Sequence, residues 1–422
     1  MFNFLIGAAT AAHQVEGNNI HSDYWIMEHT KHTDYAEPSG DACDHYHRYA
    51  EDIKLLADAG CNAYRFSIEW ARIEPEEGKF VLAEIEHYRS VLKCCYDNGL
   101  TPIVTLHHFS SPAWLIGKGG WCDRRVIGYF ERYARYIAEN LGDMTPYICT
   151  INEANMGFQL NKVAADMMKA GRKKPKEGDV QVGVTVDLKK VVLAMFEQGK
   201  AFYCSPFKVN SFLKPRKWKQ EQIVMEAHQA AKQTFKALCP EAKVGLTLSL
   251  FDYQPQPGSE SKAAQLWQED FGQYLPYIQE DDFLGIQNYS RKRVDSTRAL
   301  EPGAGAPLTQ MGYEDYPAAI GHVLLKVARD FPGELLVTEN GIATADDARR
   351  CQFIREAVQG VLEVRNKGVK VTGYLYWSLL DNFEWQAGYS KTFGLVAVDR
   401  ATQKRYPKES LKILGTQMEG YV

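Results

Sequence analysis

Residues 147–155 read YICTINEAN, and residues 335–341 read LLVTENG. In each stretch a short apolar run leads into a glutamate, Glu153 in the first and Glu339 in the second. A bounded apolar run of this length predicts a buried strand. Buried strands that end in polar groups are typical of a (β/α)8 barrel, in which functional residues follow the carboxyl ends of the strands.

Six more runs of the same kind complete a set of eight, at residues 4–8, 63–67, 101–105, 244–248, 283–287 and 371–376. Longer amphipathic stretches lie between the runs and predict helices at residues 45–59, 81–98, 124–140, 220–237, 314–330 and 346–366. We therefore predict an α/β fold, a (β/α)8 TIM barrel with long βα loops at the active-site mouth. No Gly/Ser-rich or Pro-rich linker interrupts the chain, so residues 1–422 are predicted to form one catalytic domain.

The longest span without a clear pattern covers residues 161–219, which include the charged run KAGRKKPKEGD. We interpret this span as an irregular, solvated insertion after the fourth strand, because a charge run at a surface is the common case.

Composition excludes several classes of function. The chain has 45% hydrophobic residues and a net charge of -4, without a basic stripe, so a nucleic-acid partner is not expected. No stretch approaches the roughly 20 apolar residues of a membrane span. The apolar start FNFLIGAATAA lacks a preceding Lys or Arg, so it is not interpreted as a secretion signal. Nine cysteines without CxxC spacing predict reduced thiols and a cytoplasmic location.

Polar and aromatic residues at the strand ends form the candidate site: Gln14, Arg65, His108, Asn152, Glu153, Tyr289, Glu339, Asn340 and Trp377. For Glu153 or Glu339 alone, a charge that ends a strand in water explains the residue equally well. Two acids at the same mouth favour catalysis, because both would lose hydration there.

Paired carboxyl groups suit glycoside cleavage, which needs one neutral acid to protonate the leaving oxygen and one carboxylate at the anomeric carbon. Arg65 is expected to keep Glu339 ionised, and the Tyr289 hydroxyl is expected to donate a hydrogen bond to it. A retaining reaction requires the two carboxyl groups to lie about 5–5.5 Å apart.

Seven segments, in order along the chain, resemble glycoside hydrolase family 1, the β-glucosidase family: FLIGAATAAHQVEG, YRFSIEWARIEPEEG, PIVTLHHFSSPAWL, TINEAN, LGIQNYS, LLVTENGIA and GYLYWSLLDNFEWQAGY. The resemblance implies the barrel fold, net retention and no cofactor or metal. It also implies that Glu153 is the acid/base and Glu339 the nucleophile. The sugar hydroxyls would be held by Gln14, His108, Asn152, Glu384 and Trp385, above a floor formed by Trp377. Core packing remains the alternative for the two tryptophans and for His108.

The chain departs from the family pattern at three motifs. Ala154 stands where proline is usual, Gln287 and Asn288 stand where asparagine and tyrosine are common, and Ser110 and Ser111 replace an Asp-Leu pair. The serine change is expected to lie at the rim of the site. The presence of Glu153, an acid, favours a hydrolase over a thioglucosidase, and Glu384 argues against a 6-phosphoglycosidase because its charge would repel a sugar phosphate.

The predicted function is hydrolysis of terminal β-D-glucosyl residues from small β-glycosides or cello-oligosaccharides. A β-galactosidase or β-fucosidase of the same family is the nearest alternative. Two further alternatives come from other classes. One is a metal-dependent barrel hydrolase that uses His45 and His47, or His107 and His108, and the other is an inactive carbohydrate-binding barrel.

Overall fold

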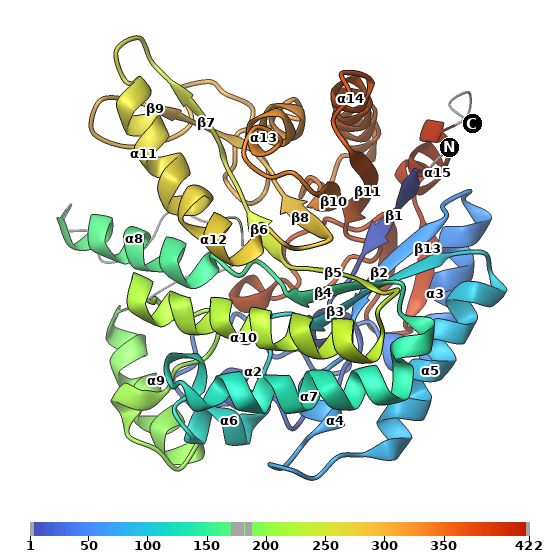
Figure 1. Cartoon of the computed structure of the whole chain (residues 1–422), viewed down its shortest axis with the longest axis vertical. Coiled ribbons are helices and arrows are strands. Elements are labelled where there is room, and N and C mark those ends of the chain that lie inside the picture. Colours follow the sequence, from blue (N-terminus) through green and yellow to red (C-terminus); the bar gives the residue numbers. More distant parts are fainter. Residues whose placement is uncertain (1–3, 170–180, 182–187, 419–422) are drawn as a thin grey trace.

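Parallel strands wind into a barrel surrounded by helices in the computed structural model, which describes residues 4–169, 181 and 188–418 (Figure 1). The strands lie in the order β5-β4-β3-β2-β1-β11-β10-β8-β6. The predicted (β/α)8 fold is confirmed. The barrel strands are β1 (Leu5–Ala9), β2 (Ala63–Ser67), β3 (Thr101–His107), β4 (Tyr147–Ile151), β5 (Lys243–Gly245), β6 (Thr247–Ser249), β8 (Phe283–Gln287), β10 (Glu334–Asn340) and β11 (Val371–Trp377).

The fifth predicted strand, residues 244–248, is divided into β5 and β6 around Leu246. β5 pairs with β4, whereas β6 pairs with β8 on the opposite side. The two halves stand at the two ends of the strand order, so this one segment closes the ring. Because strands in a closed barrel are tilted and staggered, a segment can exchange one neighbour for the other along its length.

Helices cover the outside of the barrel, and five of the six predicted ones agree with the structure to within two residues at each end. The exception is the prediction for residues 314–330, where α13 spans only Ala319–Val327. Glu314 pairs with Leu308 in an isolated bridge, and Pro317 disfavours a helical conformation for the residue before it. The other five are α3 (His45–Asp58), α5 (Leu82–Asp97), α7 (Arg125–Leu141), α10 (Trp218–Leu238) and α14 (Asp347–Asn366).

The insertion after the fourth strand is not irregular as predicted, because two long helices occur in it, α8 (Met156–Lys169) and α9 (Leu188–Ala201). Met156, Leu160 and Met167 recur at helical spacing on α8 and are buried, which explains the helix. Of the charged run KAGRKKPKEGD, residues 170–179 lie outside the described residues.

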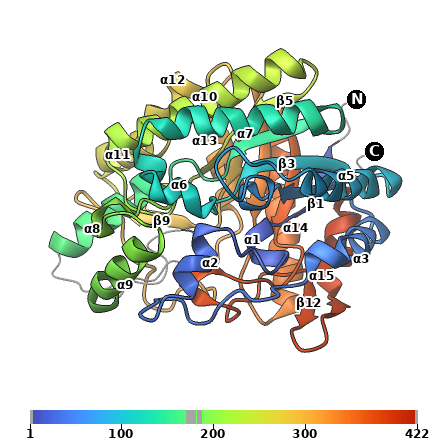
Figure 2. The ribbon, with the colours of Figure 1, turned by 90° about the horizontal axis from the view of Figure 1, so that it is seen from below.

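α8, α9 and the ribbon of β7 (Asp252–Pro255) and β9 (Arg291–Val294) lie on the side of the barrel away from both chain ends (Figures 1 and 2). β1 begins next to the amino terminus and all barrel strands are parallel, so their carboxyl ends face that side. Elements that the sequence did not predict include this ribbon and the hairpin of β12 (Val396–Asp399) and β13 (Lys404–Pro407). The shorter helices are α1 (Ala12–Val15), α2 (Asp23–Glu28), α4 (Trp70–Ile73), α6 (Ala113–Gly117), α11 (Glu260–Asp270), α12 (Leu275–Ile278) and α15 (Glu409–Gly415).

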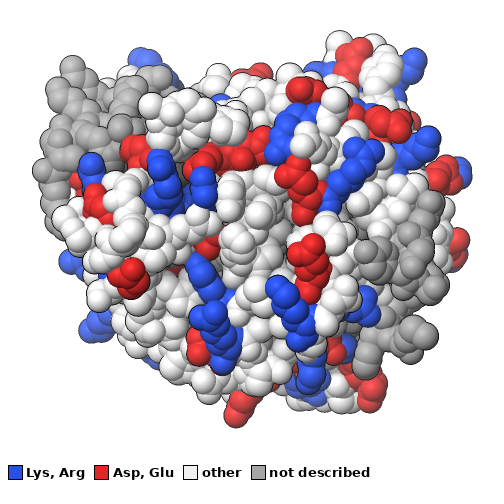
Figure 3. Space-filling model, turned by 90° about the horizontal axis from the view of Figure 1, so that it is seen from above, with Lys and Arg blue, Asp and Glu red and all other residues white. Residues whose placement is uncertain are grey.

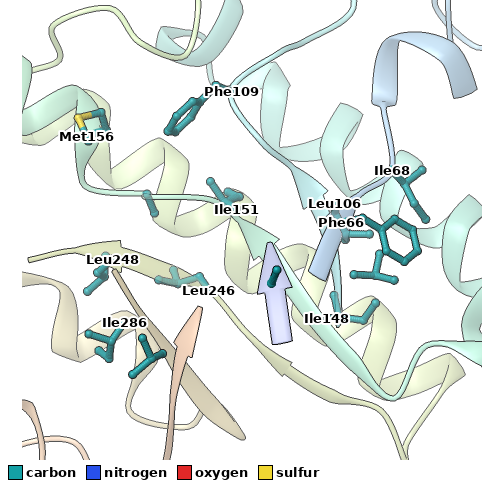
Figure 4. Packing of buried hydrophobic residues seen from close by; sticks show 14 of the residues in the cluster. Phe66, Ile68, Leu106, Phe109, Ile148, Ile151, Met156, Leu246, Leu248 and Ile286 are labelled. Carbon is teal, nitrogen blue, oxygen red and sulfur yellow. The ribbon is translucent and has the colours of Figure 1, made fainter. Parts of the chain in front are cut away.

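Apolar side chains fill both the interior of the barrel and the layer between strands and helices. Leu248 on β6 and Ile286 on β8 are register partners and pack in the outer layer (Figure 4). A separate buried cluster takes one residue from most of the barrel strands: Leu5, Ala63, Ile103, Cys149, Phe283, Leu336 and Leu375. Side chains two positions apart on a strand point to the same face, so Arg65 follows Ala63 into the interior. Apolar packing therefore ends one layer below the polar site.

None of the described helices has the length and apolarity that crossing a bilayer requires.

Candidate active site

Glu339 lies near the end of β10 and is only 3% exposed. Its Oε1 accepts hydrogen bonds from Arg65 Nη1 at 2.6 Å and from Gln287 Nε2 at 2.9 Å. Its Oε2 accepts a hydrogen bond from the Tyr289 hydroxyl at 2.6 Å. The expected partners Arg65 and Tyr289 are therefore both present. Arg65 stands within β2, not after its end as the sequence analysis placed it, and reaches Glu339 from the barrel interior.

Glu153 follows Asn152 directly after β4 and is 2% exposed. Its backbone adopts φ of 42°, which is uncommon for a residue with a side chain. Thr247 holds this turn, since its Oγ1 accepts the Glu153 N–H at 2.8 Å and its carbonyl accepts the Ala154 N–H at 3.0 Å. Oε1 of Glu153 has no hydrogen-bond partner in the protein. A buried oxygen of this kind is free to contact a substrate.

The two glutamates have unequal affinities for a proton. Burial raises the pKa of Glu153 well above its usual value, and the charge of Glu339 raises it further. Burial also raises the pKa of Glu339, but the Arg65 charge and the hydrogen bonds from Tyr289, Arg65 and Gln287 oppose that rise. Three donors directed at one carboxylate favour its ionised form. The pair therefore ionises first at Glu339, and the remaining proton stays on Glu153.

The Tyr289 hydroxyl keeps its proton while the two glutamates titrate, because burial and then the Glu339 charge raise its pKa well above the usual value. Its ring packs in a small cluster with Trp377, Tyr313 and Phe393. The hydroxyl is thereby fixed toward Glu339.

Hydrogen-bond directions determine which atom of His108 carries the proton. Arg65 Nη2 can only donate, so Asn152 Oδ1, at 2.5 Å, is the acceptor. Asn152 Nδ2 then faces His108 Nε2 at 3.1 Å and donates to it. Burial, followed by the charge of Arg65, lowers the His108 pKa well below its usual value, so the ring is neutral. Its proton therefore sits on Nδ1, which has no partner in the protein and can donate to a substrate hydroxyl.

Gln14 and Glu384 lie together, although 370 positions separate them in the chain. Gln14 is on α1, and its Nε2 donates to the Phe383 carbonyl at 2.7 Å and to Glu384 Oε2 at 3.3 Å. Gln14 Oε1 is buried without a partner. The pair thus offers hydrogen-bond acceptors to a polar ligand.

Trp377 and Trp385 both lie near His108, with ring centroids 5.7 and 6.4 Å from the imidazole and interplanar angles of 25° and 19°. Trp385 also stacks on His13 at 5.7 Å. Both indoles are buried, so they combine packing with a position at the site.

Three polar residues that contact the site were not found from the sequence. Gln287 donates to Glu339, Thr247 holds the Glu153 turn, and Gln181 contacts the backbone of Tyr289. Gln181 Oε1 accepts the Tyr289 N–H at 2.7 Å, and its Nε2 donates to Ser249 Oγ at 3.0 Å. A hydrogen bond from Ser249 in turn lowers the pKa of Glu153. The departure at Gln287 was a usable signal, whereas no pattern marked Thr247 or Gln181.

The expectation that Ser110 and Ser111 lie at the rim is wrong, because both are buried. Ser110 Oγ donates to Glu69 Oε2 at 2.6 Å. Ser111 Oγ lies 3.0 Å from both His107 Nε2 and Trp121 Nε1. The small hydroxyls fit here because each satisfies a buried polar neighbour.

The histidines proposed for a metal-dependent hydrolase have protein partners. His45 Nδ1 lies 2.7 Å from Asp52 and its Nε2 lies 3.0 Å from the Tyr64 hydroxyl, while His47 is exposed beside Asp44. Among residues 4–169, 181 and 188–418, no three or more His, Cys, Asp or Glu side chains group as metal ligands would.

The sequence model of glycosyl hydrolase family 1 matches residues 2–285 and 271–416. This chain belongs to glycosyl hydrolase family 1. It is therefore a glycoside hydrolase, as the sequence motifs predicted. β-Glucosidase A of Thermotoga maritima is 32% identical, with 96% of this chain and 95% of that protein aligned. A crystal structure of the β-glycosidase BGL167 is 41% identical, with a TM-score of 0.89 over 99% of this chain and 96% of that one.

The relatives of this family 1 hydrolase do not all carry the same activity in their names. A 6-phospho-β-galactosidase of Clostridium acetobutylicum is 29% identical, with 97% of this chain and 94% of that protein aligned. Overall similarity therefore leaves the choice of sugar to the residues of the site.

Proposed function

We propose that this family 1 hydrolase removes terminal β-D-glucosyl residues with retention of configuration, with Glu339 as nucleophile and Glu153 as acid/base. The observation that carries the proposal is the unequal environment of two buried glutamates. Glu339 receives three hydrogen bonds from side-chain donors, whereas Glu153 keeps an oxygen without a partner. One carboxylate and one carboxylic acid are what the reaction needs.

In the first step Glu339 attacks the anomeric carbon, the bond to the leaving oxygen breaks, and Glu153 gives that oxygen its proton. In the second step Glu153 takes a proton from water, whose oxygen bonds to the anomeric carbon while the ester to Glu339 breaks. We expect the carboxyl groups to lie about 5–5.5 Å apart in the working enzyme. Both steps balance with these two side chains and water alone.

Asn152 and His108 are proposed to bind sugar hydroxyls next to the reacting carbon, and Gln14 and Glu384 to bind those farther away. The His108 Nδ1 proton and the Gln14 oxygen have no partner in the protein, so a hydroxyl can use both without breaking an existing bond. Trp377 and Trp385 would cover the apolar face of the ring.

Glu384 supports a neutral sugar over a phosphorylated one, because a buried carboxylate repels a phosphate. Galactose and fucose keep most of the same hydroxyls, so β-galactosides and β-fucosides are expected as weaker substrates. Small glycosides or cello-oligosaccharides are the proposed substrates. On the face shown in Figure 3 acidic and basic side chains are interspersed, which gives no single-sign field for a polyanion. Nine free thiols support a reducing, cytoplasmic setting.

The test is to treat the enzyme with a 2-fluoro-β-glucoside that bears a good leaving group, and to map the labelled peptide by mass spectrometry. Label on Glu339, and none in Glu339→Gln, is the expected result. Label on another residue would refute the assignment of the nucleophile. Turnover of aryl β-glucoside, β-galactoside, β-fucoside and 6-phospho-β-glucoside by the same preparation ranks the sugars, and a preference for the phosphorylated substrate would refute the argument from Glu384.

A further inference from the structure

Gln287 is the last residue of β8, is fully buried, and stands where family 1 commonly has asparagine. Its amide nitrogen lies within hydrogen-bond distance of three acceptors: Asn152 Oδ1 at 2.7 Å, Glu339 Oε1 at 2.9 Å and Thr247 Oγ1 at 3.1 Å. These acceptors come from three strands or strand ends around the barrel. A single side chain therefore joins the residue before the acid/base to the nucleophile.

The orientation of this amide follows from its neighbours. Asn152 Oδ1 must be an acceptor because Arg65 donates to it, and the carboxylate of Glu339 is an acceptor as well. A Gln287 oxygen in the same place would face both of them, so the nitrogen occupies it. The two N–H groups are directed at the two nearer acceptors, and Thr247 Oγ1 already receives the Glu153 N–H.

Glutamine reaches these acceptors with one methylene more than asparagine, about 1.5 Å of extra length. A second departure from the family supports the same connection. Ala154 has a backbone N–H, which proline lacks, and donates it to the Thr247 carbonyl at 3.0 Å. Ala154 thus bonds to Thr247, and the Gln287 amide nitrogen packs 3.1 Å from Thr247 Oγ1, so both departures contact the residue that holds the acid/base turn.

We propose that Gln287 is a positioning residue that keeps Glu339 ionised and locks it to Asn152, coupling the nucleophile to the acid/base side of the site. The inference rests on the proposed role of Glu339. The Gln287 oxygen is buried without a hydrogen-bond partner. The polar contacts that account for burying this amide are therefore those of its nitrogen.

The test compares Gln287→Met with the wild type. Methionine keeps the length and the apolar volume but removes the N–H donors, so the core should still pack. Loss of a donor to a carboxylate raises its pKa. The acid limb of the kcat/KM profile on an aryl β-glucoside should therefore move to higher pH by about one unit, the size of a charged hydrogen bond. Active sites are counted by the burst of aryl alcohol released on labelling with the fluoroglucoside.

Two further variants sharpen the result. In Gln287→Glu the new carboxyl group can donate only while it is protonated. The kcat/KM of this variant should therefore fall as pH rises, and this basic limb of its profile should lie at lower pH than in the wild type. Gln222→Leu removes a glutamine amide that donates to the Tyr277 hydroxyl on the outside of the barrel, and it should leave both limbs in place.

An unchanged acid limb in Gln287→Met, with label still on Glu339, would overturn the positioning role. A loss of active sites with the limb unchanged would show a merely structural residue and would overturn it as well. Label on a different residue in the wild type would instead refute the proposed function.

Discussion

Replacing Tyr289 with phenylalanine removes one oxygen atom and tests the electrostatics of the nucleophile directly. The hydroxyl donates to Glu339 Oε2 at 2.6 Å, and it is the hydrogen bond that the structure records for that oxygen. The ring would keep its packing against Tyr313 and Phe393, whose centroids lie 6.3 and 6.0 Å away. The change therefore isolates one bond to a charged group.

A hydrogen bond to a charged group contributes about 1.5–3 kcal/mol, which corresponds to about a 10- to 150-fold loss in rate if the bond is used in the transition state. The pKa of Glu339 should rise, because the lost donor favours the ionised form. Since Glu339 must be ionised to attack, the acid limb of kcat/KM should move to higher pH by at least about one unit. Initial rates on an aryl β-glucoside across pH measure both quantities.

Tyr253→Phe is the matched control, because its hydroxyl also donates to a carboxylate, Asp270, at 2.5 Å but outside the site. It should lower the melting temperature and leave the acid limb unmoved. A loss of less than about threefold in Tyr289→Phe, together with an unshifted acid limb, would refute the view that this hydroxyl stabilises the charge of Glu339.

Three other predictions follow from the same site and from one buried ion pair. Glu153→Gln should reduce kcat/KM by about 10²–10⁴-fold for glycosides with poor leaving groups and far less for activated aryl glycosides, and equal losses on both would exclude Glu153 as the acid. The wild-type kcat/KM profile should be bell-shaped, because activity falls below the pKa of Glu339 and above that of Glu153; a flat profile from about pH 4 to 9 would contradict two titrating carboxyl groups. Asp52→Asn should destabilise the fold by about 3–5 kcal/mol at pH 7, because Arg405 donates to both oxygens of this fully buried carboxylate. Burial alone would raise the Asp52 pKa, but Arg405 and His45 lower it below its usual value. The stability that the ion pair contributes is therefore present above the pKa of Asp52 in the unfolded chain, and it is lost as pH falls through the pKa of Asp52 in the folded protein. Thermal melts should show a smaller difference in melting temperature between the wild type and Asp52→Asn at acid pH than at pH 7.

Much of the fold was readable because barrel strands are locally encoded. Buried parallel strands are short apolar runs, and the helices between them carry an apolar stripe, so most element bounds agree with the prediction to within two residues. The errors arose where local pattern and tertiary pairing disagree. Residues 244–248 are one apolar run, yet they divide into β5 and β6 because each half bonds to a different neighbour. The helices α8 and α9 were not predicted, because the charged run within residues 161–219 made that span look irregular.

The sequence by itself determined the family, the barrel and the two glutamates proposed for catalysis, because each glutamate ends a recognisable strand run. Only the tertiary structure decided how these acids differ. Their proton affinities depend on burial and on donors such as Arg65 and Gln287, which come from strands far apart in the chain. The strength of a hydrogen bond changes over a few tenths of an ångström, and desolvation depends on the atoms that surround a group in three dimensions. Neither property can be read from the residue spacing along a single strand.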